Sequence, residues 1–224
     1  MYSEDSTVLP ALKRMRLGHH FCGIYQTDAD HRRIVVDFVR LGVERHEKIL
    51  YLVNLQTSDQ LKATLSAEGI DVTALLASGQ LVIRSAREAY LADGIFDPEK
   101  MVEAIRTETT NAVAEGYSAL RVTGEMTWAL SGDPGTERLA EYESMISSYF
   151  ATGAKVYSVC QYDQRRFDPD LLMDVLQAHP QALIGTQGLD NSNMYYVPPE
   201  ALLAPDRSNA ILETRIANLL KTAA

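Results

Sequence analysis

Histidine, cysteine and glutamate side chains occur where three apolar runs of the chain could bring them together. His20 and Cys22 are two residues apart, so both point to one face if their run is a strand. Cys160 lies in a second run, and Glu125 follows Gly124 at the end of a third. An imidazole, two thiols and a carboxylate are all groups that bind transition metals.

The alternative is that both cysteines are small core residues, because no C-x-x-C or H-x-x-x-H spacing accompanies them. We therefore predict no metal and no other cofactor. If a metal is nevertheless bound, His20, Cys22 and Cys160 are the candidate ligands.

Glu125 is also a candidate for a small-molecule site, because Trp128, the single tryptophan, follows it closely. A carboxylate against an aromatic wall can have a raised pKa and can act as acid, base or hydrogen-bond partner. The competing interpretation is an exposed glutamate in a loop. Tyr25 and Tyr162 lie at the ends of two other apolar runs, and Glu143 lies beside the apolar stripe of a helical segment. These three side chains either line a mixed pocket or serve in packing and hydration.

Residues 25–32 join an apolar run to a helical pattern, where many α/β proteins bind phosphate. Alignment with G-x-x-x-x-G-K-[ST] puts Tyr25 and Asp30 at the two glycines, His31 at the lysine and Arg32 at the hydroxyl residue. A tyrosine blocks the approach of the backbone to phosphate, and an aspartate repels it. The loop is therefore predicted not to bind a nucleoside triphosphate.

Strands and helices are predicted to alternate along the chain. Apolar runs predict strands at 21–25, 49–53, 81–84, 119–126, 155–162, 182–185 and 194–198. Helical periodicity and capping residues predict helices at 31–46, 57–67, 71–77, 97–116, 135–153, 168–180 and 206–221. This alternation predicts a three-layer α/β domain with a mostly parallel sheet. Ligands of such domains bind at the carboxyl ends of the strands, which we call the strand-end rim.

The composition limits the classes of partner. The chain has 224 residues, a net charge of −9 and a pI near 5.0, which disfavours binding to nucleic acid or to anionic membrane. No apolar run approaches the ~20 residues that span a bilayer. With two cysteines and no signal-type segment, a cytoplasmic location is expected. We expect a flexible lead-in over 1–17, a body over 18–204 and a C-terminal helix over 205–224.

Six segments, taken in order, resemble the MEDS domain, a DcmR-type sensory domain. They are HHFCGIY, KILYLVN, GEMTWAL, YES, VCQYDQRRF and NMYYVPPEALL, and the resemblance covers about residues 18–204. The family is similar in fold to RecA- and KaiC-like ATPases but lacks their phosphate loop. The resemblance implies a role in sensing small molecules, proposed to be hydrocarbon derivatives, within regulators joined to DNA-binding or histidine-kinase modules. This sequence shows neither module, so we expect a stand-alone sensor or a piece of a larger regulator.

The predicted function is a non-catalytic cytoplasmic sensor that binds a small, largely apolar molecule at the strand-end rim. Its predicted lining is His20, Cys22, Tyr25, Glu125, Trp128, Glu143 and Tyr162. The loop 131–135 is the predicted moving part, and the expected partner is a kinase or a transcription regulator. The sequence contains no G-x-S-x-G motif, so it does not indicate a serine hydrolase.

Two alternatives remain. The chain could be a scaffold or partner-binding module that uses the helix at 206–221, which could also pair with a second copy. An enzyme that hydrolyses nucleotide would require Glu125 to work without the phosphate loop.

Overall fold

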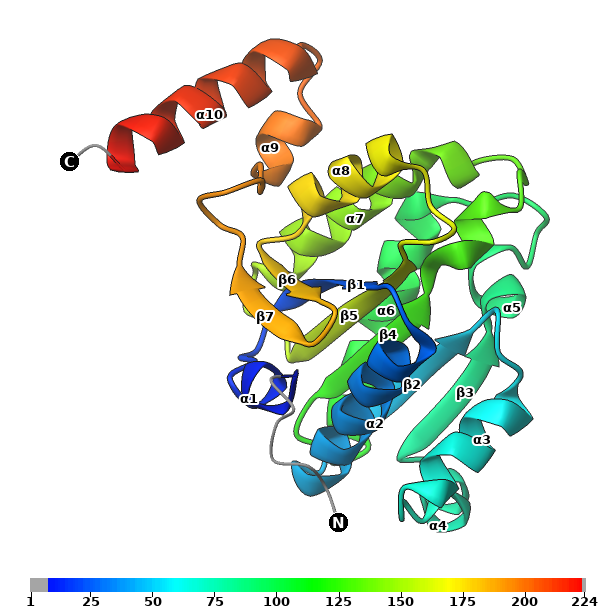
Figure 1. Cartoon of the computed structure of the whole chain (residues 1–224). Helices are drawn as coiled ribbons and strands as arrows, with labels where there is room; N and C mark the ends of the chain where they lie inside the picture. The colour runs from blue at the N-terminus through cyan, green and yellow to red at the C-terminus, as the bar shows by residue number, and fades with distance from the viewer. Residues whose placement is uncertain (1–7, 223–224) are drawn as a thin grey trace.

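The structure is a computed structural model that describes residues 8–222. These residues fold into one sheet with helices on both sides (Figure 1). The strands are β1 His20–Tyr25, β2 Lys48–Val53, β3 Leu81–Ser85, β4 Leu120–Glu125, β5 Val156–Asp163, β6 Gln181–Ile184 and β7 Gln187–Asp190. The α-helices are α1 Val8–Lys13, α2 Asp28–Glu44, α3 Ser58–Ala67, α4 Val72–Ala77, α5 Ala86–Tyr90, α6 Pro98–Ala114, α7 Leu139–Phe150, α8 Pro169–Ala178, α9 Pro199–Leu202 and α10 Arg207–Thr222. Two 3-10 helices, η1 Met126–Leu130 and η2 Thr136–Arg138, follow β4.

The sheet has the strand order β3-β2-β4-β5-β1-β6-β7. All neighbouring strands pair in parallel except β6 and β7, which form an antiparallel edge. The carboxyl ends of β1, β2, β4 and β5 therefore share one rim. The prediction of a mostly parallel α/β sheet is confirmed.

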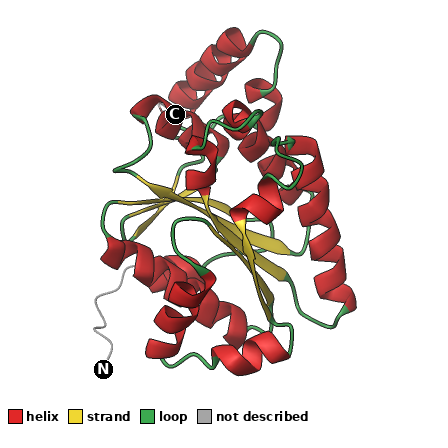
Figure 2. Ribbon diagram, turned by 90° about the vertical axis from the view of Figure 1, so that its right-hand side faces the viewer, coloured by secondary structure: helices red, strands yellow, loops and turns green. Residues whose placement is uncertain are grey.

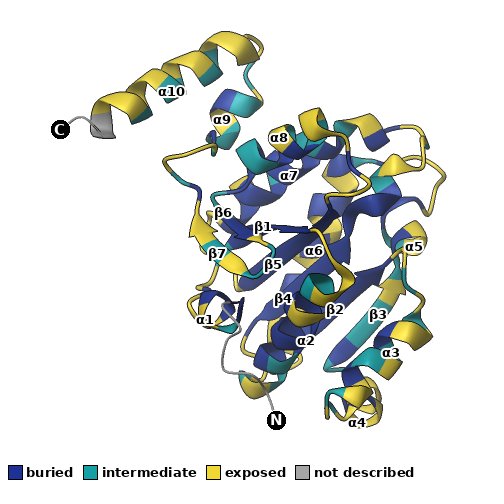
Figure 3. Cartoon of the chain, in the orientation of Figure 1, coloured by how far each residue is buried: buried dark blue, intermediate teal, exposed yellow. Residues whose placement is uncertain are grey.

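Helices cover both faces of the sheet, so the domain has three layers (Figure 2). One face packs against α1 to α4, and the other packs against α5 to α8. The central strands β1, β2, β4 and β5 are buried at every position, as the dark strands in Figure 3 show. The three-layer architecture predicted from the alternation is therefore also confirmed.

The predicted Asp-Pro helix starts are present at α6 and α8. Asp97 accepts a hydrogen bond from the backbone N–H of Lys100, and Pro98 occupies the first turn of α6. Asp168 accepts one from the backbone N–H of Asp170 at the start of α8. These caps satisfy backbone donors that a helix start leaves unpaired.

Two segments differ from the expectation. In place of the flexible lead-in, α1 packs on α2 and β7, and Val8 and Leu12 are fully buried; residues 1–7 lie outside the described part. The strand predicted at 194–198 was wrong, because these residues form a turn and an irregular segment. The side chain of Asn191 fixes this turn by accepting the backbone N–H of Tyr195. The second edge strand is instead β7, which lies earlier in the chain.

The predicted C-terminal helix is present as α10, which extends away from the body of the domain and has its main contacts with α9 (Figure 1). Among the helices of residues 8–222, none combines the length and the apolar character that crossing a bilayer requires.

Candidate functional site

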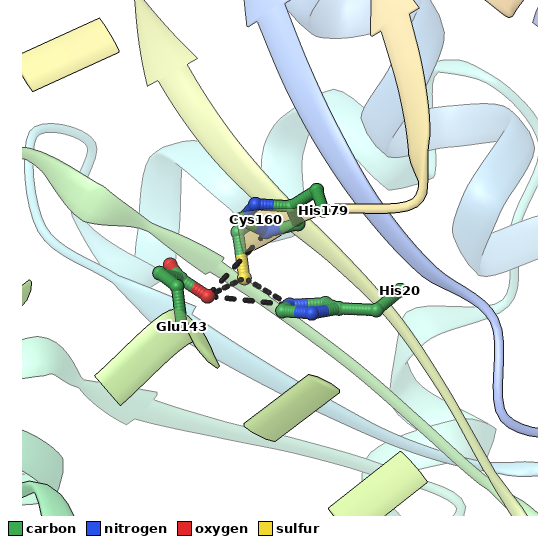
Figure 4. A group of neighbouring side chains, drawn as sticks. All are labelled: His20, Glu143, Cys160 and His179. Carbon is green, nitrogen blue, oxygen red and sulfur yellow. Dashed lines mark hydrogen bonds and ion pairs between the residues drawn. The ribbon is translucent and has the colours of Figure 1, made fainter. Parts of the chain in front are cut away.

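A buried polar centre lies between α7 and the sheet, and consists of His20, Glu143, Cys160 and His179 (Figure 4). His20 begins β1, Cys160 lies in the adjacent β5, Glu143 is on α7, and His179 follows α8. Cys22 is in register with Cys160, so His20, two residues earlier in β1, points to the same face. None of the four side chains is reached by solvent to more than a few per cent.

The four side chains meet within 4.8 Å of one another. His20 Nε2 lies 3.2 Å from Glu143 Oε2 and 3.3 Å from Cys160 Sγ. Glu143 Oε2 lies 3.4 Å from Cys160 Sγ and 3.4 Å from His179 Nε2. Glu143 is therefore the member that contacts the other three.

Hydrogen bonds on the outer side of each imidazole fix its tautomer. Ser147 Oγ donates to the carbonyl of Ala178 at 2.6 Å, so it must accept the proton of His20 Nδ1 at 2.8 Å. His179 Nδ1 donates to the carbonyl of Val175 at 2.6 Å. A neutral ring with its proton on Nδ1 carries a lone pair on Nε2, and both Nε2 atoms face the centre.

Glu143 is ionised in this environment. Burial raises its pKa, but the neighbouring His179 and His20 more than offset this, so that its pKa lies well below the usual range. Burial and His179 lower the pKa of His20 to about 4, and burial with the nearby Glu143 raises the pKa of Cys160. Tyr162 donates its hydroxyl proton to Glu143 Oε1, leaving Oε2 directed at the centre.

The seven predicted site residues do not form one rim pocket. His20, Cys22, Glu143 and Tyr162 lie on the sheet face under α7 and α8. His20 is at the end of β1 opposite to the rim, whereas Tyr162 lies next to the carboxyl end of β5. Tyr25 is five residues after His20, so the alternation of side chains puts it on the opposite face. Glu125 also faces that side, and Trp128 packs separately in η1.

Glu125 lies at the strand-end rim, where it organises the loop after β2. Its Oε2 accepts the backbone N–H groups of Asn54, Leu55 and Gln56 at 3.0, 2.5 and 3.2 Å. Its Oε1 accepts the side-chain amide of Gln56 at 2.6 Å. The carboxylate is thus occupied by the chain itself and is 1% exposed.

The loop after β1 is filled by its own side chains. The rings of Tyr25 and His31 stack with centroids 4.4 Å apart. His31 Nε2 lies 2.6 Å from Gln161 Oε1, which also accepts the hydroxyl proton of Tyr51. The side chain of His31, at the lysine position of the motif, therefore points into the protein toward Gln161.

Trp128 belongs to a buried aromatic cluster with Tyr90, Phe96 and Tyr142. Its ring stacks on Tyr90 at 4.3 Å and lies 4.5 Å from Phe96. Tyr142 packs edge-on against both of these rings and directly precedes Glu143 in α7. The indole N–H of Trp128 meets no acceptor within the described part of the chain, although it is buried.

His179 was not predicted from the sequence. It has no short spacing to any other metal-binding residue type, but it precedes β6 much as His20 begins β1, and these strands are neighbours.

Two surface grooves, of about 420 and 260 Å³, are lined by none of the seven predicted residues.

A family model described as "MEDS: MEthanogen/methylotroph, DcmR Sensory domain" matches residues 19–180. The transcriptional repressor DcmR of Methylorubrum extorquens is 24% identical over 160 residues, which are 71% of this chain. The match spans 57% of the repressor, so the chain corresponds to little more than half of that protein. All four residues of the polar centre lie inside the range matched by the family model.

The structure of the chain is similar to that of a KaiC-like protein from the archaeon Pyrococcus horikoshii. The TM-score is 0.55 at 10% identity, covering 76% of this chain and 72% of the other. This likeness shows a shared KaiC-like, and hence RecA-like, fold.

Proposed function

The chain belongs to the MEDS family of sensory domains, and from this premise we propose that it is a non-catalytic module that detects a small, largely apolar molecule. The family match supports the sensory role, and similarity to a repressor supports a connection to transcription. The molecule we expect is a hydrocarbon derivative with one polar group.

The observation that carries this proposal is the buried indole N–H of Trp128, which finds no acceptor among residues 8–222 and lies within an aromatic cluster. A buried donor without an acceptor destabilises the protein by about 1–3 kcal/mol, so such a group is normally paired. An acceptor atom on a small apolar guest would satisfy it, while Tyr90 and Phe96 would contact the apolar part. Tyr142 connects this cluster to the polar centre at Glu143.

The contacts of the rim argue against nucleotide hydrolysis. Glu125 is occupied by three backbone N–H groups, and His31 is bonded to Gln161. Neither side chain is then available to hold a metal–phosphate group. The non-catalytic role is thus supported by the same hydrogen bonds that shape the rim.

The loop 131–135, between η1 and η2, is the element we propose to move. The backbone N–H of Phe96 donates to the carbonyl of Pro134, which ties the loop 131–135 to the aromatic cluster. A guest that displaces Trp128 would break this tie. A sensor needs two such states, because a ligand shifts an equilibrium only through its different affinity for them.

Fluorescence of Trp128 gives a direct test, since the chain has one tryptophan. We would titrate the protein with a panel of short-chain alcohols, thiols, amines and halides. We expect saturable fluorescence changes with at least one chemical class, together with faster hydrogen exchange at residues 131–135. Tyr90→Leu should weaken the response, whereas Tyr195→Leu, in the segment between β7 and α9, should not. If no compound gives a saturable change, the sensing proposal is wrong.

A second candidate function is suggested by α10. Leu212, Ile216 and Leu220 are exposed along one side of this helix, at the spacing of an apolar stripe. We propose that this stripe docks a signalling partner, either a kinase, a transcription regulator or a second copy. Leu212→Ser with Ile216→Ser should abolish partner binding or dimerisation in light scattering without changing the Trp128 response. Unchanged association would exclude the stripe.

Charge and cysteine content support two further proposals, one on contact with DNA and one on location. With a net charge of −9, the signal is proposed to reach DNA through a partner protein rather than by direct contact. The two buried, unpaired cysteines agree with the reducing conditions of the cytoplasm, which is the compartment we propose.

A further inference from the structure

We infer that His20, Glu143, Cys160 and His179 bind one divalent metal ion of the zinc class. This inference deepens the proposed function and rests on it for the use of the centre in sensing. The binding of the ion itself follows from geometry and can be measured without any small molecule.

The first argument is the convergence of lone pairs. The outer hydrogen bonds of His20 and His179 leave both Nε2 lone pairs facing Glu143 Oε2. Together with Cys160 Sγ, these atoms make four that face one another. When both rings are neutral, the only proton on these four atoms is that of the Cys160 thiol. His179 Nε2 is fully buried and has no hydrogen-bond partner among residues 8–222. A cation at the middle of the cluster would satisfy all four groups at once.

The second argument is the separation of the ligand atoms. Tetrahedral zinc has bonds of about 2.0–2.3 Å to nitrogen, oxygen and sulfur, which place neighbouring ligands about 3.3–3.6 Å apart. Four of the pairs in this cluster lie 3.2, 3.3, 3.4 and 3.4 Å apart. The other two pairs, both of which include His179, fall within 4.8 Å. A shift of one imidazole would therefore complete the coordination.

The third argument is charge. A thiolate from Cys160 and the carboxylate of Glu143 together neutralise a divalent ion, and two neutral imidazoles add nothing. A neutral site is what a fully buried position requires, since an isolated charge there is strongly destabilising. Sulfur and imidazole ligands favour zinc-class ions over magnesium or calcium, which take oxygen ligands.

The fourth argument is the surrounding shell. Ser147, Val175 and Tyr162 each hydrogen-bond the outer atom of a ligand, as is usual at metal centres. With four protein ligands the ion is enclosed. It would tie β1, α7, β5 and the start of β6 together next to the aromatic cluster, rather than offer an open coordination position.

The test is the metal content of the whole chain purified from zinc-supplemented cells. We expect one zinc per chain by elemental analysis and by native mass spectrometry. Exchange for Co²⁺ should give the absorption of a tetrahedral site together with a sulfur-to-cobalt band. Cys160→Ser should lose the sulfur band, and His179→Gln should lower metal affinity at least tenfold.

Cys22→Ser is the matched control. Cys22 is fully buried in β1 and in register with Cys160, but it lies outside the cluster. It should keep both the metal and the cobalt spectrum, and circular dichroism would establish that both serine variants are folded. A wild-type protein that contains no stoichiometric metal and takes up no Co²⁺ would overturn the inference. So would loss of the sulfur band in Cys22→Ser. If the protein binds no metal but Trp128 still responds to a small molecule, the metal inference is wrong and the sensing proposal is retained.

Discussion

His20 and His179 lie at the amino ends of neighbouring parallel strands, with ring centroids 4.0 Å apart and both Nε2 atoms facing Glu143. Two imidazoles from opposite ends of the matched range thus share one carboxylate inside the core. This relationship makes Glu143 the residue on which the interior of that sheet face depends.

Glu143→Gln should be strongly destabilising. The substitution keeps the shape but removes the charge that the two histidines and Tyr162 surround. Removing a charged hydrogen-bond acceptor from a buried site typically costs about 1.5–3 kcal/mol in the free energy of unfolding. Urea denaturation measures this. Glu141→Gln, on the exposed side of α7 and paired with Arg138, should cost about 1 kcal/mol or less. Equal losses in the two variants would contradict the central place of Glu143.

Glu125→Gln should loosen the loop after β2. The amide retains one acceptor oxygen and cannot serve both the three backbone N–H groups and the side chain of Gln56. Since hydrogen bonds to charged groups contribute about 1.5–3 kcal/mol, we expect a loss in that range. Hydrogen exchange at residues 54–56 should accelerate while exchange in α6 stays unchanged. ATP turnover should be absent before and after the substitution, and turnover that Glu125→Gln abolishes would restore the enzymatic alternative.

Asp163 should support stability at neutral pH but not in acid. Burial raises its pKa, but hydrogen bonds from Arg165 and the nearby Arg166 hold it below the usual value. Because the folded pKa is lower than the unfolded value of about 3.9, the contribution is complete above that pH. It is then lost as the pH falls through the folded pKa.

Asp163→Asn should therefore cost about 1 kcal/mol at neutral pH, since both arginines are half exposed and screened. The difference from wild type should vanish in strong acid. Asp59→Asn, at an almost fully exposed carboxylate, is the control and should change stability little at either pH. A deficit for Asp163→Asn that does not depend on pH would refute the assignment.

Two glycines in the loop 131–135 allow a matched comparison. Gly135 has φ 89°, and a Cβ atom there would lie 2.1 Å from the carbonyl oxygen of Phe96. Gly132 has φ 76° but faces open space. Gly132→Ala should cost about 1–2 kcal/mol through the left-handed backbone alone.

Gly135→Ala should cost a further ~1–3 kcal/mol, because the added methyl group pushes the loop away from Phe96. The fluorescence of Trp128, which packs on Phe96, should change in Gly135→Ala and not in Gly132→Ala. If both variants leave the spectrum unchanged, the loop is not coupled to the aromatic cluster.

Much of the fold was readable from local patterns. Apolar runs and Asp-Pro caps predicted six of the strands and the main helices, since burial on both faces and capping act within a few residues. The alternation of side chains also put His20 and Cys22 on one face. The same alternation separates Tyr25 from them, but its position at a strand end suggested a shared rim.

The polar centre was less accessible to prediction. His179 has no local spacing that marks it, and its partners are brought close only when β6 docks beside β1. Glu143 and Tyr162 were predicted as the lining of a rim pocket, whereas the hydroxyl group of Tyr162 bonds Glu143 beneath α7. Helix α1 was missed because a short segment becomes helical through packing on α2 and β7, which the local sequence does not reveal.

The order in which the four residues of the centre leave the ribosome has a consequence for biogenesis. Glu143 and His20 are synthesised well before His179, so a nascent chain has a core carboxylate with half of its imidazole complement missing. The interior under α7 cannot close until β6 has been translated and docked. Truncation before that strand should consequently leave an aggregation-prone intermediate for chaperones rather than a smaller folded domain.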